Sequence, residues 1–421
     1  MVDTPSAPGP RRRTLLHAAA ESTPRLSWPW RSRCTLSIQA GGQRYLPHIR
    51  TAMQGARKSI CVELYMCNAG ALFDEWLGVW AAAVARGVEV RLLLDAIGSL
   101  GLRDEDAERL CAAGVTLQWF NPVRTGHLIA TLVRDHRKLI IVDDQRAWVG
   151  GMGIDDRYDP RISGEEAWMD AMVACEGPVV ADFRSLFDQA WHLAAAGPLT
   201  GAVRWRLGGH PRPAARRAHA DTTWARVNGS RGGRNNPLMR TLVRRVLRAR
   251  EGVWLCTPYF LPPRSLLKAL LYTARRGVPV HLTLCGQHTD HPWLRYAGQH
   301  YYQRLLEAGV HISEYDARFL HLKAAQADQW STLGSFNYDR WNSSWNLEAN
   351  VEAVDGEFAD HVRALRERLD KESVHISAAD WAARSHWQRW RNAFWNRAGL
   401  RLIKVLGGLW RVARQRPGGD G

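Results

Sequence analysis

The stretches "DHRKLIIVDDQRAWVGGMG" (residues 135–153) and "FLHLKAAQADQWSTLGSFNYD" (residues 319–339) share one layout. In each, a histidine is followed two residues later by a lysine and five residues after that by an aspartate, which gives His136, Lys138 and Asp143 in the first copy and His321, Lys323 and Asp328 in the second. One such pattern arises by chance in roughly one chain in a hundred of this composition. Two copies at corresponding places indicate a duplicated unit.

Three further segments recur in the same order. "ICVELY", "ARGVEVRLLLD" and "ERLCAAGVTLQWF" in the first half resemble "VWLCTPY", "RRGVPVHLTLCG" and "QRLLEAGVHISEY" in the second. Each half is predicted to run as strand, helix and strand, with helices that end at glycines. Alternating strands and helices predict an α/β fold. We therefore expect two similar α/β/α lobes related by a pseudo-twofold axis, with the active site between them.

Composition divides the chain into five parts. Residues 208–237 are rich in glycine, proline and arginine, which predicts a linker or surface loop between the two halves. The expected parts are a basic N-terminal arm (1–36), a first lobe (37–200), the linker (201–237), a second lobe (238–372) and a basic, tryptophan-rich, amphipathic C-terminal tail (373–421).

The charge of the chain favours anionic partners. Its 421 residues carry a formal net charge of +16, which suits nucleic acid, acidic lipid surfaces or phosphate-bearing substrates. No uncharged run approaches the ~18–20 residues that a membrane span needs, so we expect a soluble or peripheral protein.

The seven cysteines are scattered, and several lie in apolar runs. This pattern predicts buried, reduced thiols in place of a disulfide framework. One loop, "CGQHTDHPW", offers Cys285, His288 and His291 as an alternative metal site, but a loop after a strand is the commoner explanation of such a sequence. No metal or other cofactor is expected.

The duplicated motif suits phosphodiester chemistry. Residues two apart on a strand point to one face, so each histidine projects together with its lysine. If the halves pack about a pseudo-twofold axis, two imidazoles and two ammonium groups meet in one cleft. One imidazole then attacks phosphorus, the other transfers the proton, and the lysines neutralise the phosphoryl oxygens without a metal. The alternative is two core histidines with outward-pointing lysines, which a repeated motif makes less favourable.

The paired motifs resemble those of the phospholipase D superfamily. This resemblance implies the phospholipase D fold and a phosphate-binding Gly-Ser-x-Asn turn after each motif, which carries over to Ser335 and Asn337 in the second copy and to Gly151 in the first. Gly153 stands where the first copy would have asparagine. The resemblance also implies an acid that orients each histidine: Glu348 for His321 and Asp170 for His136. The residues predicted to be catalytic are the histidine, lysine and aspartate of each motif, so they include Asp143 and Asp328. In the family, however, the aspartates of the motif usually have a structural role.

Within the superfamily, "TPYFLPP", "GSFNYD" and "NLEAN" resemble bacterial cardiolipin synthases of the short form without N-terminal transmembrane helices. The resemblance implies a phosphatidyltransferase that makes cardiolipin from phosphatidylglycerol and a second phospholipid through a phosphohistidine, and it favours His136 as the nucleophile. It also implies a peripheral protein on the cytoplasmic side of the bacterial membrane, with anionic phospholipids and no nucleic acid as partners. The alternatives are a phospholipase D or metal-independent nuclease, in which water attacks, and a non-catalytic protein that binds anionic surfaces.

The tail from residue 381 to residue 416 contains nine basic and no acidic residues. Its apolar residues fall at steps of three and four, which predicts one helix face made by Trp387, Trp390, Phe394, Ala398, Leu402, Val405 and Leu409. Two interpretations are open: the stripe packs on the second lobe, or it lies in a membrane interface with the arginines on anionic head groups. A break is expected at Gly407-Gly408.

Overall fold

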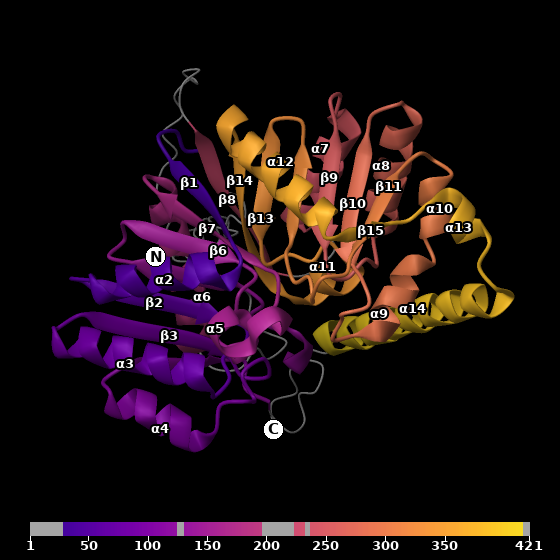
Figure 1. Cartoon of the computed structure of the whole chain (residues 1–421). Coiled ribbons are helices and arrows are strands. Elements are labelled where there is room, and N and C mark those ends of the chain that lie inside the picture. Colours follow the sequence, from indigo (N-terminus) through magenta and orange to yellow (C-terminus); the bar gives the residue numbers. More distant parts are fainter. Residues whose placement is uncertain (1–27, 124–129, 196–222, 232–235, 416–421) are drawn as a thin grey trace, which may run out of the picture.

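The computed structural model describes residues 28–123, 130–195, 223–231 and 236–415, and it shows two α/β lobes, each built around one sheet (Figure 1). The first sheet has the order β1-β7-β6-β5-β2-β3-β4 and consists of β1 (Thr35–Ala40), β2 (Ser59–Leu64), β3 (Glu89–Asp95), β4 (Thr116–Phe120), β5 (Lys138–Val142), β6 (Arg146–Gly150) and β7 (Ala171–Glu176). Its lobe also contains α2 (Gly42–Gln54), α3 (Ala71–Ala85), α4 (Asp104–Ala112), α5 (Pro160–Ser163), α6 (Val179–Ala195) and the 3-10 turns η1 (Ala130–Leu132), η2 (Asp156–Tyr158) and η3 (Gly164–Glu166).

The second sheet has the order β15-β11-β10-β9-β12-β13-β14-β8. It consists of β8 (Trp224–Arg231), β9 (Val253–Thr257), β10 (Val280–Cys285), β11 (His311–Tyr315), β12 (Ala324–Ala327), β13 (Trp330–Gly334), β14 (Leu347–Val354) and β15 (Ser373–His375). The helices of this half are α7 (Pro237–Arg248), α8 (Arg264–Arg275), α9 (Pro292–Gln299), α10 (Tyr302–Leu306), α11 (Arg340–Trp345), α12 (Gly356–Lys371), α13 (Ala378–Ala382) and α14 (His386–Gln415).

The two sheets repeat one topology. β8, β14, β13, β12, β9, β10 and β11 follow one another as β1, β7, β6, β5, β2, β3 and β4 do, and only β15 has no counterpart. The recurring "RGV" segments explain one shared feature, because Gly87 and Gly277 adopt φ of +85° and +83° just after α3 and α8. That left-handed conformation suits glycine and returns the chain into the next parallel strand. The predicted duplication and α/β class are confirmed.

The two sheets face each other across a shared core. α6 of the first lobe contacts β8, and α12 of the second lobe contacts β1, so each inner helix reaches the other lobe's edge strand (Figure 1). Apolar residues of both lobes, such as Ile141 and Val173 with Leu322 and Val351, belong to this one buried cluster. Separate clusters lie under α2 and α3 and under α7 and α8. Burial in the shared core therefore fixes one lobe against the other.

Two predicted boundaries need correction. Residues 224–231, assigned to the linker, form β8, which pairs antiparallel with β14 along its whole length. The N-terminal arm also crosses to this strand, because the Trp28 amide donates to Val227 O (3.0 Å). Most of the predicted arm and linker lies outside the described residues. The tail helix α14 runs without a break through Gly407-Gly408, contrary to the expected interruption.

Among the described residues, no helix is long and apolar enough to cross a bilayer. All seven cysteines are free, and every one but Cys111 is buried. The alternative metal site does not form, since Cys285 Sγ donates to the backbone oxygen of His288 (3.0 Å) and the described chain contains no group of three or more potential metal ligands.

Candidate active site

Both motif histidines lie where the backbones of the two lobes meet. The His136 amide donates to Leu347 O (3.0 Å), and the His321 amide donates to Met169 O (2.8 Å). Leu347 and Met169 each directly precede an acid proposed to orient a histidine. The lobes therefore join at the catalytic segments themselves, by short bridges between Asp135 and Leu347 and between Met169 and Leu320.

Each histidine is held by an acid of the opposite lobe. His136 Nδ1 lies 3.1 Å from Glu348 Oε2, and His321 Nδ1 lies 2.7 Å from Asp170 Oδ2. The predicted pairing within each half, Asp170 with His136 and Glu348 with His321, is wrong. The reason is the inter-lobe bridging, which places the start of β14 beside His136 and the start of β7 beside His321.

Burial sets the protonation of these pairs. It lowers the pKa of both histidines well below the usual value, and the nearby ammonium groups of Lys138 and Lys323 lower it further. Burial also raises the pKa of Asp170 to about 7 and that of Glu348 well above its ordinary range. The imidazoles are therefore neutral at neutral pH. When the acid is ionised, Nδ1–H donates to its carboxylate and each Nε2 keeps a free lone pair.

The two motif lysines are buried beside the histidines. Lys138 Nζ donates to His136 O (2.7 Å), and Lys323 Nζ donates to His321 O. Burial lowers the pKa of Lys138 to about 7 and that of Lys323 to about 8. An ammonium group has three N–H donors, and each of these two lysines gives a hydrogen bond to a backbone oxygen, which leaves further N–H groups for an anionic ligand.

The turn after each motif positions the orienting acid. Ser335 Oγ donates to the Glu348 carboxylate and accepts from the Ala349 amide (3.0 Å). In the first half, a Cβ added to Gly151 would lie 2.2 Å from Asp170 Oδ2, so glycine leaves the room that this carboxylate occupies. Ser335 and Gly151 therefore help to position the two orienting acids. Their predicted contact with phosphate stays a prediction.

The missing asparagine of the first half has a steric cause. A Cβ at Gly153 would lie 2.8 Å from Met66 O, which excludes a larger side chain without movement of that backbone. In the second half, Asn337 is buried, and its Oδ1 has no hydrogen-bond partner. That oxygen can only accept a hydrogen bond, so a phosphodiester does not satisfy it; the Asn337 Nδ2 group is the part of the amide that could donate to a phosphoryl oxygen.

The motif aspartates lie outside the site, at the other end of the strands that follow the histidines. Asp143 accepts from the amides of residues 57, 58 and 59 (2.7–3.2 Å), and Asp328 accepts from those of residues 250, 251 and 252 (2.8–3.2 Å). Their place among the catalytic residues is therefore corrected. Each caps the turn that leads into the neighbouring central strand, which is a structural role.

An aromatic wall that was not predicted from the sequence surrounds the histidines. The Tyr65 ring centroid lies 4.9 Å from that of His136, and Trp168 lies 5.4 Å from His321. Tyr158 Oη donates to Gly151 O (3.3 Å) and lies 3.2 Å from His321 Nδ1. Tyr65 ends a recurring segment, and Trp168 stands two residues before Asp170. Their places in the sequence could therefore have indicated that both residues lie near the site. Such rings exclude water from the imidazoles.

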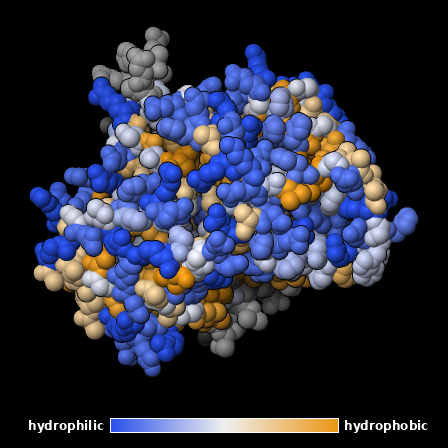
Figure 2. Space-filling view, viewed as in Figure 1, coloured by the Kyte–Doolittle hydropathy of each residue, from blue (hydrophilic) through white to orange (hydrophobic). Residues whose placement is uncertain are grey.

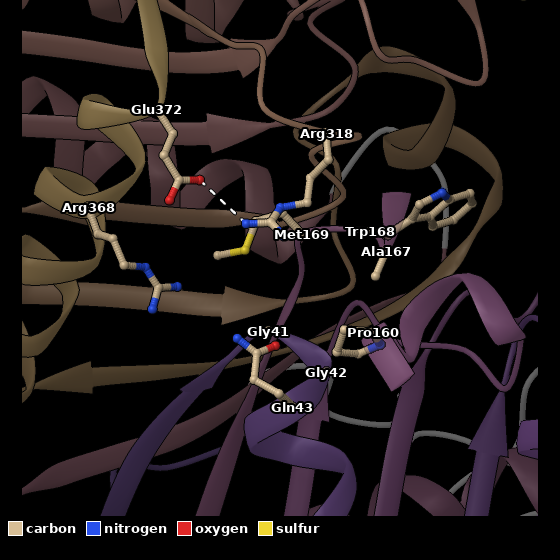
Figure 3. A pocket seen from close by; sticks show the side chains of 10 residues that line it. All are labelled: Gly41, Gly42, Gln43, Pro160, Ala167, Trp168, Met169, Arg318, Arg368 and Glu372. Carbon is tan, nitrogen blue, oxygen red and sulfur yellow. Dashed lines mark ion pairs between the residues drawn. The ribbon is translucent and has the colours of Figure 1, made fainter. Parts of the chain in front are cut away.

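A cavity of about 200 Å³ opens beside this wall, at the junction of the lobes (Figure 3). It shares Trp168 and Met169 with the surroundings of His321, and Arg318 pairs with Glu372 at its rim (3.6 Å). None of the histidines or lysines of the paired motifs lines it. This cavity is therefore distinct from the catalytic groups.

Comparison with known proteins agrees with this geometry. Cardiolipin synthase B of Escherichia coli (strain K12) is 30% identical over 370 residues, which cover 87% of this chain and 86% of that protein. The probable cardiolipin synthase YwiE of Bacillus subtilis (strain 168) is 26% identical over 86% of this chain and 71% of its own. The phosphatidylserine synthase structure from Haemophilus influenzae Rd KW20 has a TM-score of 0.70 at 14% identity, covering 88% of this chain and 94% of that one, which shows the shared fold.

Two α/β lobes with one H-x-K motif each define the phospholipase D class of enzyme. More particularly, the chain belongs to the family described as "Cardiolipin synthase, PLD-like domain", whose model matches residues 49–191 and 242–369. The predicted superfamily, its fold and an enzyme of this class are confirmed.

The caps made by the motif aspartates predict a loss of stability without a loss of chemistry. In Asp143→Ala, three backbone amides lose their acceptor, which should lower the free energy of unfolding by about 1–3 kcal/mol. Turnover per folded molecule should stay within about twofold. Asp144→Ala is the matched control, because Asp144 has nearly the same φ (56° against 55°) but accepts no such amides. Urea unfolding and activity of the folded fraction decide the point; equal destabilisation by both variants contradicts the capping role.

The space at Gly151 predicts a specific loss of activity. In Gly151→Ala the new methyl group must displace the Asp170 carboxylate from His321, so kcat should fall by about tenfold or more, in line with a general-acid–base contribution. Gly78→Ala, at an exposed helical position where an added Cβ meets nothing within 4 Å, should leave kcat unchanged. Steady-state kinetics measures the effect, and thermal unfolding is the control for folding. A Gly151→Ala variant that is folded and fully active would contradict the proposed role of Gly151 in leaving room for Asp170.

Proposed function

We propose that this protein is a phosphatidyltransferase that makes cardiolipin from phosphatidylglycerol and a second phospholipid. The observation that carries the proposal is the pair of buried histidines, each held by an acid of the other lobe and accompanied by a buried lysine. The similarity to cardiolipin synthase B along 87% of the chain supports the choice of lipid substrates.

In the first step, Nε2 of one histidine attacks the phosphorus of the donor lipid. A P–N bond forms, the P–O bond to the head-group alcohol breaks, and the second histidine, protonated, gives its proton to the leaving oxygen. We assign the attack to His136 and the proton transfer to His321, as the family resemblance favours. Lys138 and Lys323 neutralise the charge of the phosphoryl oxygens, and the Asn337 amide is a further candidate for contact with them.

In the second step, a hydroxyl group of phosphatidylglycerol gives its proton to His321 and attacks phosphorus. The P–N bond breaks, and the free His136 and cardiolipin result. The proton on His321 is taken up from solvent when the donor lipid binds. Burial and the ammonium groups lower the histidine pKa in the empty site, and the negative charge of the donor opposes both by favouring the imidazolium.

We place the enzyme on the cytoplasmic side of the bacterial membrane, as a peripheral protein with anionic phospholipids as partners. Seven free cysteines support a reducing compartment.

Product analysis tests the proposal. Purified full-length protein is incubated in EDTA with liposomes of phosphatidylglycerol, alone or mixed with phosphatidylethanolamine, and the lipids are identified by mass spectrometry. Cardiolipin with release of glycerol or ethanolamine supports the transfer and names the donor. Phosphatidic acid alone, or cleavage of single-stranded DNA in a parallel reaction, would mean that water is the acceptor. Activity that appears only after Mg²⁺ or Zn²⁺ is added would contradict the lysine-based charge neutralisation.

Substitution of either histidine tests the mechanism. His136→Ala and His321→Ala should each lower turnover by about a thousandfold or more, because the nucleophile and the proton carrier act as one unit. His361→Ala, at an exposed position on α12, is the matched control and should leave turnover unchanged. Acid quenching followed by peptide mass spectrometry should locate the phosphatidyl adduct on His136; an adduct on His321 reverses the assignment.

The lysine pKa values predict an alkaline loss of activity. As pH rises through about 7 to 8, Lys138 and then Lys323 lose their protons in the free enzyme, so the site loses the charge that binds the phosphodiester and kcat/KM should fall. A bound anion raises both lysine pKa values, so the fall in kcat should come at higher pH. Rates on a soluble short-chain diester measured from about pH 6 to pH 10 check this; a kcat/KM that is flat to about pH 9 contradicts it.

A further inference from the structure

The helix α14 presents its apolar side to solvent. Trp387, Trp390 and Phe394 are 65%, 54% and 46% exposed, whereas Asn392 and Asn396 are 2% and 4% exposed. Leu402 and Val405 continue the exposed stripe at 50% and 59%. This arrangement is the reverse of an ordinary surface helix, which buries its apolar stripe and exposes its polar side.

Packing against α9 fixes this orientation. Asn396 Nδ2 donates to Ala297 O (3.1 Å), and the ring centroids of Trp395 on α14 and Trp293 on α9 lie 6.3 Å apart. The exposed rings stack on one another, with centroids 4.9 Å apart for Trp387 and Trp390. The interpretation in which the stripe packs on the second lobe is therefore wrong for the described part of α14, because residues outside the stripe, such as Asn396 and Trp395, make that contact.

Basic residues follow the border of the exposed stripe. Arg397, Arg401 and Lys404 are exposed and, at 100° per residue, lie along one side of it. Residues 381–415 contain no acidic side chain. An apolar stripe bordered by cations alone complements a surface with an apolar interior and anionic head groups. A second copy of this helix fits less well, because two such borders would repel each other.

The stripe lies close to the catalytic edge of the second lobe. α14 contacts α9 and α11, and α11 begins three residues after Asn337. Figure 1 shows α14 along the edge where α9 and α11 lie, reaching toward the junction of the lobes. Figure 2 shows that the face seen in this view is largely hydrophilic, with small groups of hydrophobic residues between the hydrophilic ones. A bilayer held by α14 would thus lie beside the part of the second lobe that carries α11, close in sequence to Asn337.

We propose that α14 is the membrane-docking element of this protein: its stripe of Trp387, Trp390, Phe394, Leu402 and Val405 enters the interface of an anionic bilayer while Arg397, Arg401 and Lys404 hold lipid phosphates. The proposal rests on the proposed function, because an enzyme with a lipid substrate has to bind the bilayer that contains this substrate. The rings reach the acyl boundary from a helix that lies flat on the surface, and the polar side stays packed on the protein.

The test is co-sedimentation of the full-length protein with vesicles of phosphatidylcholine containing about a third phosphatidylglycerol. Two variants separate the contributions: Trp387→Ser with Trp390→Ser and Phe394→Ser, and Arg397→Gln with Arg401→Gln and Lys404→Gln. The matched control replaces Arg240, Arg244 and Arg248 by Gln, since these three arginines form an exposed stripe on α7 away from α14. Circular dichroism and activity on a monomeric short-chain lipid verify folding.

We expect the charge variant to bind these vesicles about a hundredfold more weakly, since each basic residue near an anionic surface contributes about fivefold. The aromatic variant should lose at least about tenfold, and the α7 control should bind like the wild type. Equal loss in the α7 control would overturn the proposal, as would full vesicle binding by both α14 variants. A wild-type dimer that the aromatic variant dissociates, with vesicle binding intact, would assign the stripe to a second copy.

The failure of this inference can be told apart from the failure of the proposed function. Weak vesicle binding by the α14 variants in a protein that makes no cardiolipin would support the docking element and reject the transferase. Cardiolipin synthesis with unchanged vesicle binding in both variants would do the reverse.

Discussion

The structure depends on backbone hydrogen bonds that cross between the lobes at the catalytic histidines. His136 pairs with the residue before Glu348, and His321 pairs with the residue before Asp170. Because each acid follows directly on its bridge, the contact that joins the lobes also brings each imidazole to a carboxylate of the opposite lobe. Neither lobe alone contains a complete histidine–acid pair. Lobe association and assembly of the site are therefore one event, which the shared apolar core between the sheets stabilises.

Duplication did not leave two identical halves. The second half combines Ser335 with the longer Glu348, whereas the first combines Gly151 with the shorter Asp170. Asn337 likewise has Gly153 as its counterpart, where Met66 occupies the space of a side chain. The two histidines thus have different surroundings although their motifs match. A reaction in which one imidazole attacks and the other carries a proton requires unequal histidines, and these substitutions are where the inequality lies.

Periodicity and repetition predicted most of the fold, and the paired motif predicted the site, because both are local patterns. The exchanged acids were missed since Asp170 follows His136 in the chain, and only the inter-lobe bridges show that it serves His321. β8 was hidden by the glycine and arginine content of its surroundings, although as an edge strand it needs one partner only. The tail's stripe was visible in the sequence, but the direction in which it points depends on Asn396 and its contact with α9.

Electrostatic interactions explain how the protonation of the two imidazoles changes when substrate binds. Lys138 and Lys323 are buried, and their charge is supported by Glu348 and Asp170, which are buried with them. Burial, together with these ammonium groups, keeps both imidazoles neutral in the empty site, so a nucleophilic lone pair is present before substrate arrives. A phosphodiester then adds one negative charge between the lysines. Its field favours a proton on the imidazole that is not bonded to phosphorus, so the substrate itself creates the acid that its leaving group requires.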